Sequence, residues 1–239
     1  MPTTDLISPF VVSCAGGLTL NKDVFSMQPG EALILQNFEP DIKGGYRRVG
    51  GTSLFNTTIV PQGSSTTSLV VDCSIIFNGQ IIVARGGDIH RGTTSGSFTS
   101  LTTGLGTSSK AYDFEKFNFN GTDKLIIATG HSPAQIIDSS FNVDVVNATG
   151  GGSAPTNPKF VKVFQNHMFY AGATNSQEVI FSVPFAEDNF TTGSGAGSFK
   201  VDSAVVGLKV FRNELIIFCE DRIYKLTGTT SSNFAVQEV

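Results

Sequence analysis

A repeat of about 45 residues is the sequence feature that most limits what this chain can fold into. Four segments share one order: an alternating strand, a phenylalanine, a turn asparagine, and then a strongly apolar strand. The turn asparagines lie 42, 46 and 47 residues apart, at Asn78, Asn120, Asn166 and Asn213. A repeat of this length that holds about four strands has the period of a β-propeller blade.

The local chemistry of each repeat predicts an antiparallel sheet. The Asn-Gly pairs at 78–79 and 120–121 suit the positive φ angles of a type I′ hairpin turn. Asn166 and Asn213 can adopt the same backbone, but less easily than glycine. A third strand is expected at 89–91, 135–137, 178–181 and 222–226, and a more polar fourth strand around Phe98, Phe141, Phe199 and Phe234. Such a unit buries its apolar strands only by stacking on its neighbours.

These features predict an all-β fold, a β-propeller-like array of about four antiparallel blades. The blades are expected at 66–108, 109–155, 156–202 and 203–239, after an irregular N-terminal extension over residues 1–65. Four repeats make a small or incomplete propeller, since no closing strand follows the fourth. The N-terminal stretch, another chain, or residues beyond 239 could complete it.

Composition and charge argue against some classes of protein. The net charge is −4, only 15% of residues are charged, and no run of Lys or Arg occurs. A domain that grips nucleic acid normally presents a basic face, so DNA is expected to pass this protein without specific binding. No stretch approaches the roughly 18 apolar residues of a membrane-spanning helix, and the start lacks the basic region of a signal peptide. Synthesis in the cytoplasm without a membrane anchor is expected.

The sequence contains no motif that would assign catalysis, a cofactor or a metal. There is no HExxH, GxSxG, P-loop or EF-hand pattern, and no CxxC among the cysteines. The histidines fall in different repeats, without carboxylates at metal-ligand spacing. His167 is expected to be a turn residue, at a hairpin position equivalent to Gly79 and Glu214. The protein is therefore predicted not to be an enzyme, with no catalytic, cofactor-binding or metal-binding residues. The cysteines and histidines are Cys14, Cys73, Cys219, His90, His131 and His167.

Residues 1–65 do not follow the repeat. Pro-Gly-Glu-Ala at 29–32, followed by an apolar run, could begin a short helix with an acid in its first turn, or could form a strand. The segment 39–45 is rich in turn residues. Tyr46-Arg-Arg-Val is typical of a short strand, and we expect it to lead into the first blade.

This segment resembles the N-terminal part of the tail nozzle proteins of short-tailed bacteriophages, also called tail tubular protein B or tail stabilisation proteins. Those proteins carry a Gly-Gly-Leu segment, a Pro-Gly-Glu-Ala stretch, an Asn-aromatic pair and a Gly-Tyr-Arg-Arg-x-x-Gly run before their propeller blades. Family members are usually several times longer than this chain, and the rest of the chain matches only through its blade pattern. The matching positions are Gly16, Gly17, Leu18, Pro29, Gly30, Glu31, Ala32, Asn37, Phe38, Gly45, Tyr46, Arg47, Arg48 and Gly50.

The resemblance implies a structural protein of the virion tail, made in the host cytoplasm. It would form a six-fold homo-oligomeric ring around the tail axis, beneath the portal and its adaptor, as part of the DNA-ejection conduit. The ring would also offer sites for tail fibres. Tyr46, Arg47 and Arg48 are the candidate interface residues, because a guanidinium fork suits carboxylates on a neighbour. In an isolated domain they would be a solvated strand end.

Two other functions fit a propeller. A receptor- or glycan-binding propeller, associated with tail fibres or a baseplate, would need an exposed aromatic cluster on one face. A propeller enzyme such as a glycosidase would need acids that converge on the central channel, and no such register repeats between the blades.

Overall fold

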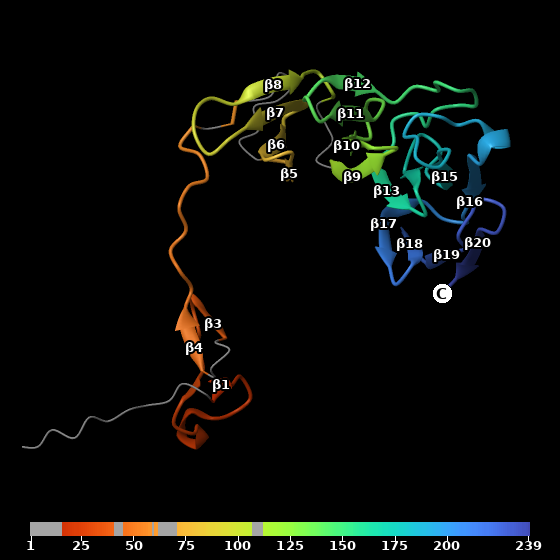
Figure 1. Ribbon diagram of the computed structural model, residues 1–239. Helices are drawn as coiled ribbons and strands as arrows, with labels where there is room; N and C mark the ends of the chain where they lie inside the picture. The colour runs from red at the N-terminus through yellow and green to blue at the C-terminus, as the bar shows by residue number, and fades with distance from the viewer. Residues whose placement is uncertain (1–15, 41–44, 59, 62–70, 107–111) are drawn as a thin grey trace, which may run out of the picture. The chain divides into compact units, whose positions relative to one another are not determined.

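The computed structural model describes residues 16–40, 45–58, 60–61, 71–106 and 112–239 (Figure 1). The protein is an all-β chain: the described residues contain no α-helix and only two single-turn 3-10 helices, Val24–Ser26 and Thr192–Ser194. Contacts divide the chain into two compact units, Met1–Leu54 and Phe55–Val239. Cys14 lies outside the described residues, as does the expected start of the first blade, residues 66–70.

The second unit consists of four antiparallel sheets, each with four strands in chain order. This confirms the predicted array of four blades, and the third and fourth strands begin close to the expected positions. The blades are β5 (Cys73–Phe77), β6 (Gln80–Arg85), β7 (Asp88–Gly92) and β8 (Thr99–Thr102); β9 (Asp113–Phe119), β10 (Thr122–Ala128), β11 (Gln135–Asp138) and β12 (Val143–Val145); β13 (Phe160–Phe164), β14 (His167–Ala171), β15 (Glu178–Phe181) and β16 (Gly197–Lys200); and β17 (Val205–Phe211), β18 (Glu214–Cys219), β19 (Ile223–Thr227) and β20 (Ala235–Glu238).

The four predicted turn asparagines all have positive φ, between 44° and 66°. In the first two blades the asparagine is the first central residue of the hairpin turn and a glycine follows it. In the third and fourth blades the asparagine is the second central residue, after Gln165 and Arg212, which also have positive φ. The shift makes one expectation wrong. His167 is not a turn residue: it pairs with Phe164 as the first residue of β14 and is buried.

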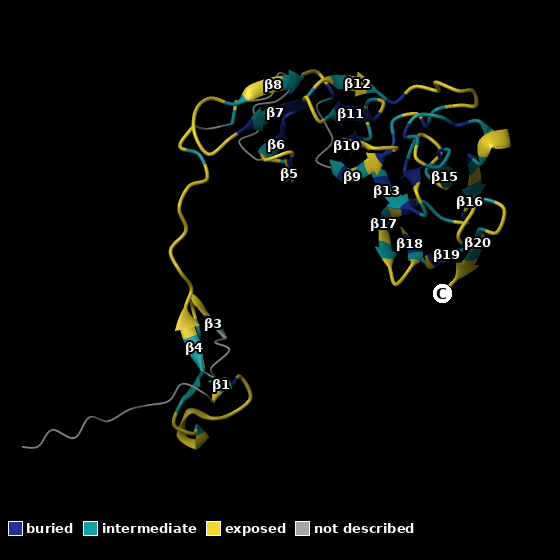
Figure 2. Cartoon of the chain, viewed as in Figure 1, coloured by how far each residue is buried: buried dark blue, intermediate teal, exposed yellow. Residues whose placement is uncertain are grey.

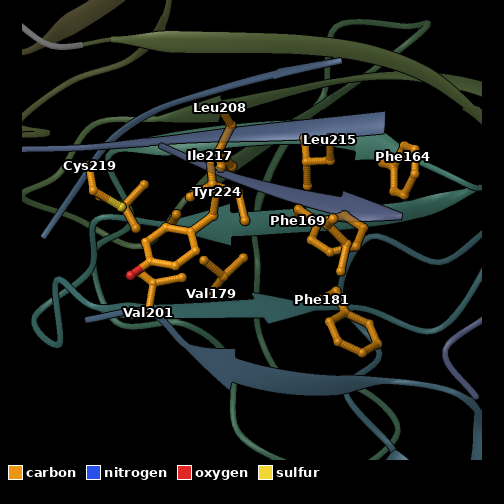
Figure 3. Close-up of a cluster of buried hydrophobic side chains, with 13 residues drawn as sticks. Phe164, Phe169, Val179, Phe181, Val201, Leu208, Leu215, Ile217, Cys219 and Tyr224 are labelled. Carbon is orange, nitrogen blue, oxygen red and sulfur yellow. The ribbon is translucent and has the colours of Figure 1, made fainter. Parts of the chain in front are cut away.

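The apolar core of the blades forms three clusters of buried side chains, each between two successive blades. One joins the first and second blades, around Phe77 and Leu125, and another joins the second and third, around Phe119 and Tyr170. The third joins the third and fourth blades. Figure 3 shows Tyr224 of the fourth blade beside Val179 of the third. Both faces of the two middle blades are therefore buried, as expected for stacked repeats.

Polar contacts also link the first strands of successive blades. A carboxylate oxygen of Asp113 accepts a hydrogen bond from the backbone N–H of Val161, at 2.9 Å. Glu115 accepts one from the N–H of Val163 at 3.3 Å and forms an ion pair with Lys162. Burial raises the pKa of Asp113, and the bond from Val161 opposes that rise. The contacts align β9 with β13.

The N-terminal unit has small sheets of its own. β1 (Gly17–Leu18) pairs in parallel with β2 (Glu31–Ala32), so the segment 29–32 enters a strand rather than a helix. β4 (Tyr46–Arg48) pairs with β3 (Phe38–Pro40). The expectation that Tyr46–Arg48 leads into the first blade is therefore wrong, because its backbone partners lie in β3. None of the described strands of this unit pairs with a blade strand.

The blade unit begins before the expected boundary at residue 65, because a segment from Phe55 is held on the first blade. The side-chain amide of Asn56 donates to the carbonyl oxygens of Thr93 and Gly96, at 2.8 and 3.0 Å. The guanidinium of Arg85 donates to the carbonyl oxygen of Val60. These bonds explain why the contacts divide the chain after Leu54.

Candidate interaction surfaces

The predicted interface residues lie on the short hairpin of β3 and β4. Arg47 stands opposite Glu39, and its Nε donates to a carboxylate oxygen of Glu39 at 2.7 Å. Both side chains are exposed, so the ion pair contributes little to stability. Arg48 stands opposite Phe38 and lines an open hollow with Gly50 and Gly51, and no described carboxylate forms an ion pair with it. Arg48 is the cation of this hairpin that is open to a partner.

Four residues that match the nozzle pattern lie close together in the N-terminal unit: Gly16 lies beside Glu31, and Gly17 lies beside Tyr46. A Cβ on Gly16 would lie 2.7 Å from Cγ of Glu31, and one on Gly17 would lie 3.2 Å from the hydroxyl oxygen of Tyr46. The Glu31 carboxylate binds Lys22 Nζ at 2.6 Å and the N–H of Gln28 at 2.8 Å, and these bonds lower its pKa. At these two positions glycine therefore lets β1 approach β2 and the Tyr46 side chain.

The N-terminal unit exposes most of its large apolar side chains. Thr19 is its one buried residue among those described. Figure 2 shows β3, β4 and the turns around β1 mainly as exposed or intermediate. An apolar surface of this kind usually marks a contact with another molecule. The exposed large apolar residues are Leu18, Leu20, Val24, Phe25, Leu33, Ile34, Phe38, Val49 and Leu54.

A second group of exposed apolar residues lies on the fourth blade, on the face that does not pack against the third. Its members come from β17, β18, β19 and the last residue of the chain. Between Phe77 and Val205 the described part of the chain has one exposed large apolar side chain, Phe185. This face could not be predicted from the sequence, because the last repeat carries the same apolar pattern as the others. The residues are Val206, Phe211, Phe218, Ile223 and Val239.

The described histidines and cysteines do not come together in one site. His167 is packed among aromatic rings and its Nδ1 lies 2.6 Å from the carbonyl oxygen of Ser182. His90 is buried in β7, and neither of its ring nitrogens has a hydrogen-bond partner among the described residues. Burial lowers the pKa of both. Among the described residues no group of three His, Cys, Asp or Glu side chains could hold a metal ion.

A hollow of about 460 Å³ opens between the hairpin tips of the first two blades. Phe117 lines it and stacks on the exposed Phe185, with ring centroids 6.2 Å apart. The side-chain amide of Asn78 donates to the carbonyl oxygen of Ser139 across the hollow, at 2.7 Å. Polar groups line the rest: Lys116, Asn118, Asp123 and Lys124.

Neither a protein-family model nor a curated protein sequence matches the chain. Among solved structures it is similar to the extracellular domain of the one component system BT4673 from B. thetaiotaomicron, with 11% identity and a TM-score of 0.52; the match covers 75% of this chain and 22% of that one. It is also similar to BBS1N in its complex with ARL6DN, with 12% identity, a TM-score of 0.48 and coverage of 71% and 51%. A third is Sqt1 of Saccharomyces cerevisiae, with 9% identity and a TM-score of 0.47; the match covers 84% of this chain and 54% of that one.

The chain spans about half the length of BBS1N and of Sqt1, and a smaller share of the BT4673 domain. At these identities the likeness concerns the fold alone. No helix in the described part of the chain is long and apolar enough to cross a membrane.

Proposed function

We propose that this protein is a non-enzymatic structural subunit of a bacteriophage tail, a nozzle-like component that assembles into a homo-oligomeric ring. The observation that carries the proposal is the concentration of exposed apolar side chains in the N-terminal unit and on the fourth blade. Terminal repeats of an array that stands alone need a polar outer face for solubility. An apolar one indicates a face that packs against further protein.

The assignment to a phage tail is supported by the N-terminal motif. Of its matching residues, Gly16 lies beside Glu31 and Gly17 beside Tyr46, and the unit exposes Arg48 and several large apolar side chains. In the proposed ring, Tyr46, Arg47 and Arg48 contact a neighbouring subunit or the portal adaptor. The acidic net charge of −4 suits a conduit that DNA passes without binding.

The test combines mass measurement with negative-stain microscopy of the purified chain, alone and with a portal and adaptor complex of a short-tailed phage. We expect closed rings, six-fold as in the resembling family, that co-sediment with the complex. Arg48→Ala should weaken that co-sedimentation more than Arg47→Ala, because Arg47 already pairs with Glu39 within its own hairpin. A strictly monomeric particle that joins neither virions nor portal complexes would contradict the proposal.

A second candidate, a glycan-binding propeller, is favoured by one observation, the hollow beside Phe117. An aromatic ring next to amide, carboxylate and ammonium groups is the kind of lining that sugars bind. A glycan array would test it: hits that Phe117→Ala abolishes would favour this function, whereas an array without hits would leave the hollow as packing between hairpins.

A further inference from the structure

Because the four blades repeat the same strand positions, the exposure of a side chain in one blade can be compared with that of its equivalents in the other three. The last residue of the first strand is a phenylalanine in every blade. Phe77, Phe119 and Phe164 are 3–4% exposed, because each lies in the cluster that joins its own blade to the next. Phe211 occupies the same position in the fourth blade and is 58% exposed. Phe211 is therefore the residue type that packs between blades at this position, but no neighbouring blade in the described part of the chain covers it.

A cross-strand pair between the second and third strands repeats the pattern. The pairs Ala84–Ile89, Ile126–Ile136 and Ala171–Val179 are buried between blades. The equivalent pair in the fourth blade is Phe218–Ile223, and each of its side chains is about 40% exposed. Three equivalent positions thus keep an apolar side chain on a face that this chain leaves uncovered.

The first blade has the complementary feature on its opposite face. The residue before the hairpin phenylalanine points to the preceding blade: Val163 and Val210 pack into the clusters that hold the preceding blade's phenylalanine. Asn118 holds this position in the second blade. Its equivalent in the first blade, Ile76, is 63% exposed. The segment from Phe55 lies over part of this face: Phe55, Asn56, Thr58 and Val60 line a hollow with Ser74, Ile81 and Val83, and Val60 accepts a hydrogen bond from Arg85. Ile76, at the hairpin end of the first strand, stays exposed beside this covered part.

We propose that the fourth blade of one copy packs head to tail on the first blade of a second copy, with Phe211 beside Ile76 of that copy. Inside the chain, the first strands of successive blades contact one another, β5 with β9, β9 with β13 and β13 with β17. The proposed contact continues this stack from β17 to β5 of the next copy. A head-to-tail contact uses two different surfaces and closes into a ring when its rotation allows. The inference rests on the proposed homo-oligomer.

Disulfide trapping tests the pairing in the full chain. The three native cysteines are first replaced by alanine, and Phe211→Cys and Ile76→Cys are then made in separate, differently tagged chains. Under mild oxidation, the mixture of the two chains should give a cross-linked heterodimer, and each chain alone should not. Ser153→Cys replaces Phe211→Cys in the matched control, because residue 153 is exposed in a loop outside either face. Cross-linking of Phe211→Cys with itself would mean that two fourth blades face each other and would overturn the proposal.

Charge insertion gives an independent readout. Phe211→Asp and Ile76→Asp should each weaken self-association at least about tenfold, as removal of a central apolar anchor does, without altering the unfolding of the monomer. If the unmodified chain forms rings but neither variant nor cross-link has an effect, this contact is wrong and the ring proposal stands. If the unmodified chain stays monomeric at all concentrations, the proposed contact and the proposed ring are both wrong.

Discussion

At the scale of single residues, His90 is a buried polar side chain at an apolar position. Ile137, Ile180 and Tyr224 occupy the equivalent place on the third strands, each opposite the fourth residue of the second strand. Within the described part of the chain, neither ring nitrogen of His90 has a hydrogen-bond partner. His90→Ile should therefore raise the free energy of unfolding by about 1 kcal/mol at pH 7.5, since it removes an unsatisfied polar group. Urea unfolding of the wild type and the variant measures this difference in the free energy of unfolding.

The advantage of His90→Ile should grow in acid. Burial holds the pKa of His90 below its ordinary value of 6.5 in the folded chain. Below pH 6.5 the unfolded chain binds a proton that the folded chain does not, so the wild type loses stability as the pH falls toward the lowered pKa. His167→Phe is the contrasting variant: it also removes a titrating group, but it leaves the Ser182 carbonyl unpaired and should destabilise at pH 7.5. Destabilisation by His90→Ile would contradict this account.

Gly152 and Gly79 separate two reasons for a glycine. Both have positive φ, at 76° and 74°. A Cβ on Gly79 would meet nothing within 4 Å, whereas one on Gly152 would lie 2.1 Å from the carbonyl oxygen of Phe190. Gly79→Ala should cost about 1 kcal/mol, the penalty of the backbone conformation. Gly152→Ala should cost about 3 kcal/mol or more, because Phe190 must also move. Equal costs in urea unfolding would contradict the clash.

At the scale of elements, the hairpin turns are where the blades differ. The first two use Asn-Gly, while Gln165-Asn166 and Arg212-Asn213 place two non-glycine residues at positive φ. Replacing either pair with Asn-Gly should stabilise the chain by about 1 kcal/mol, because glycine and asparagine adopt a type I′ turn at lower cost. Thermal unfolding of the third- and fourth-blade variants measures the gain. The reverse change, Asn78-Gly79 to Gln-Asn, is the control and should destabilise.

Local chemistry explains which elements were predictable from the sequence. The turn asparagines and the phenylalanine before each were visible because a type I′ turn and a buried strand end demand those residue types. The position of His167 was not, since the turn shifts by one residue between blades and spacing alone does not show it. The partner of Tyr46–Arg48 was also hidden, because strand pairing in so short a hairpin depends on neighbours rather than on its own residues. Phe211 is exposed because none of the described sheets covers the outer face of the fourth blade, which no local pattern records.

At the scale of the whole molecule, the blade array behaves as a one-dimensional stack. Its three clusters each join two neighbours, so the middle blades have two apolar contacts and the end blades one. The two ends differ. The segment from Phe55 is bonded onto the first blade, while the outer face of the fourth blade keeps its exposed apolar residues.

The bonds of this segment make a prediction about where the array begins. A chain of residues 55–239 should unfold in urea as the full chain does, because each described strand of the N-terminal unit pairs within that unit. A chain of residues 62–239 should lose about 2 kcal/mol. It lacks the two hydrogen bonds of Asn56, and the buried Arg85 loses the carbonyl of Val60. Asn56→Ala in the longer chain should reproduce part of that loss. If the chain 62–239 is as stable as the chain 55–239, the segment from Phe55 does not stabilise the first blade. The array then begins at the first strand, as the sequence repeat alone predicts.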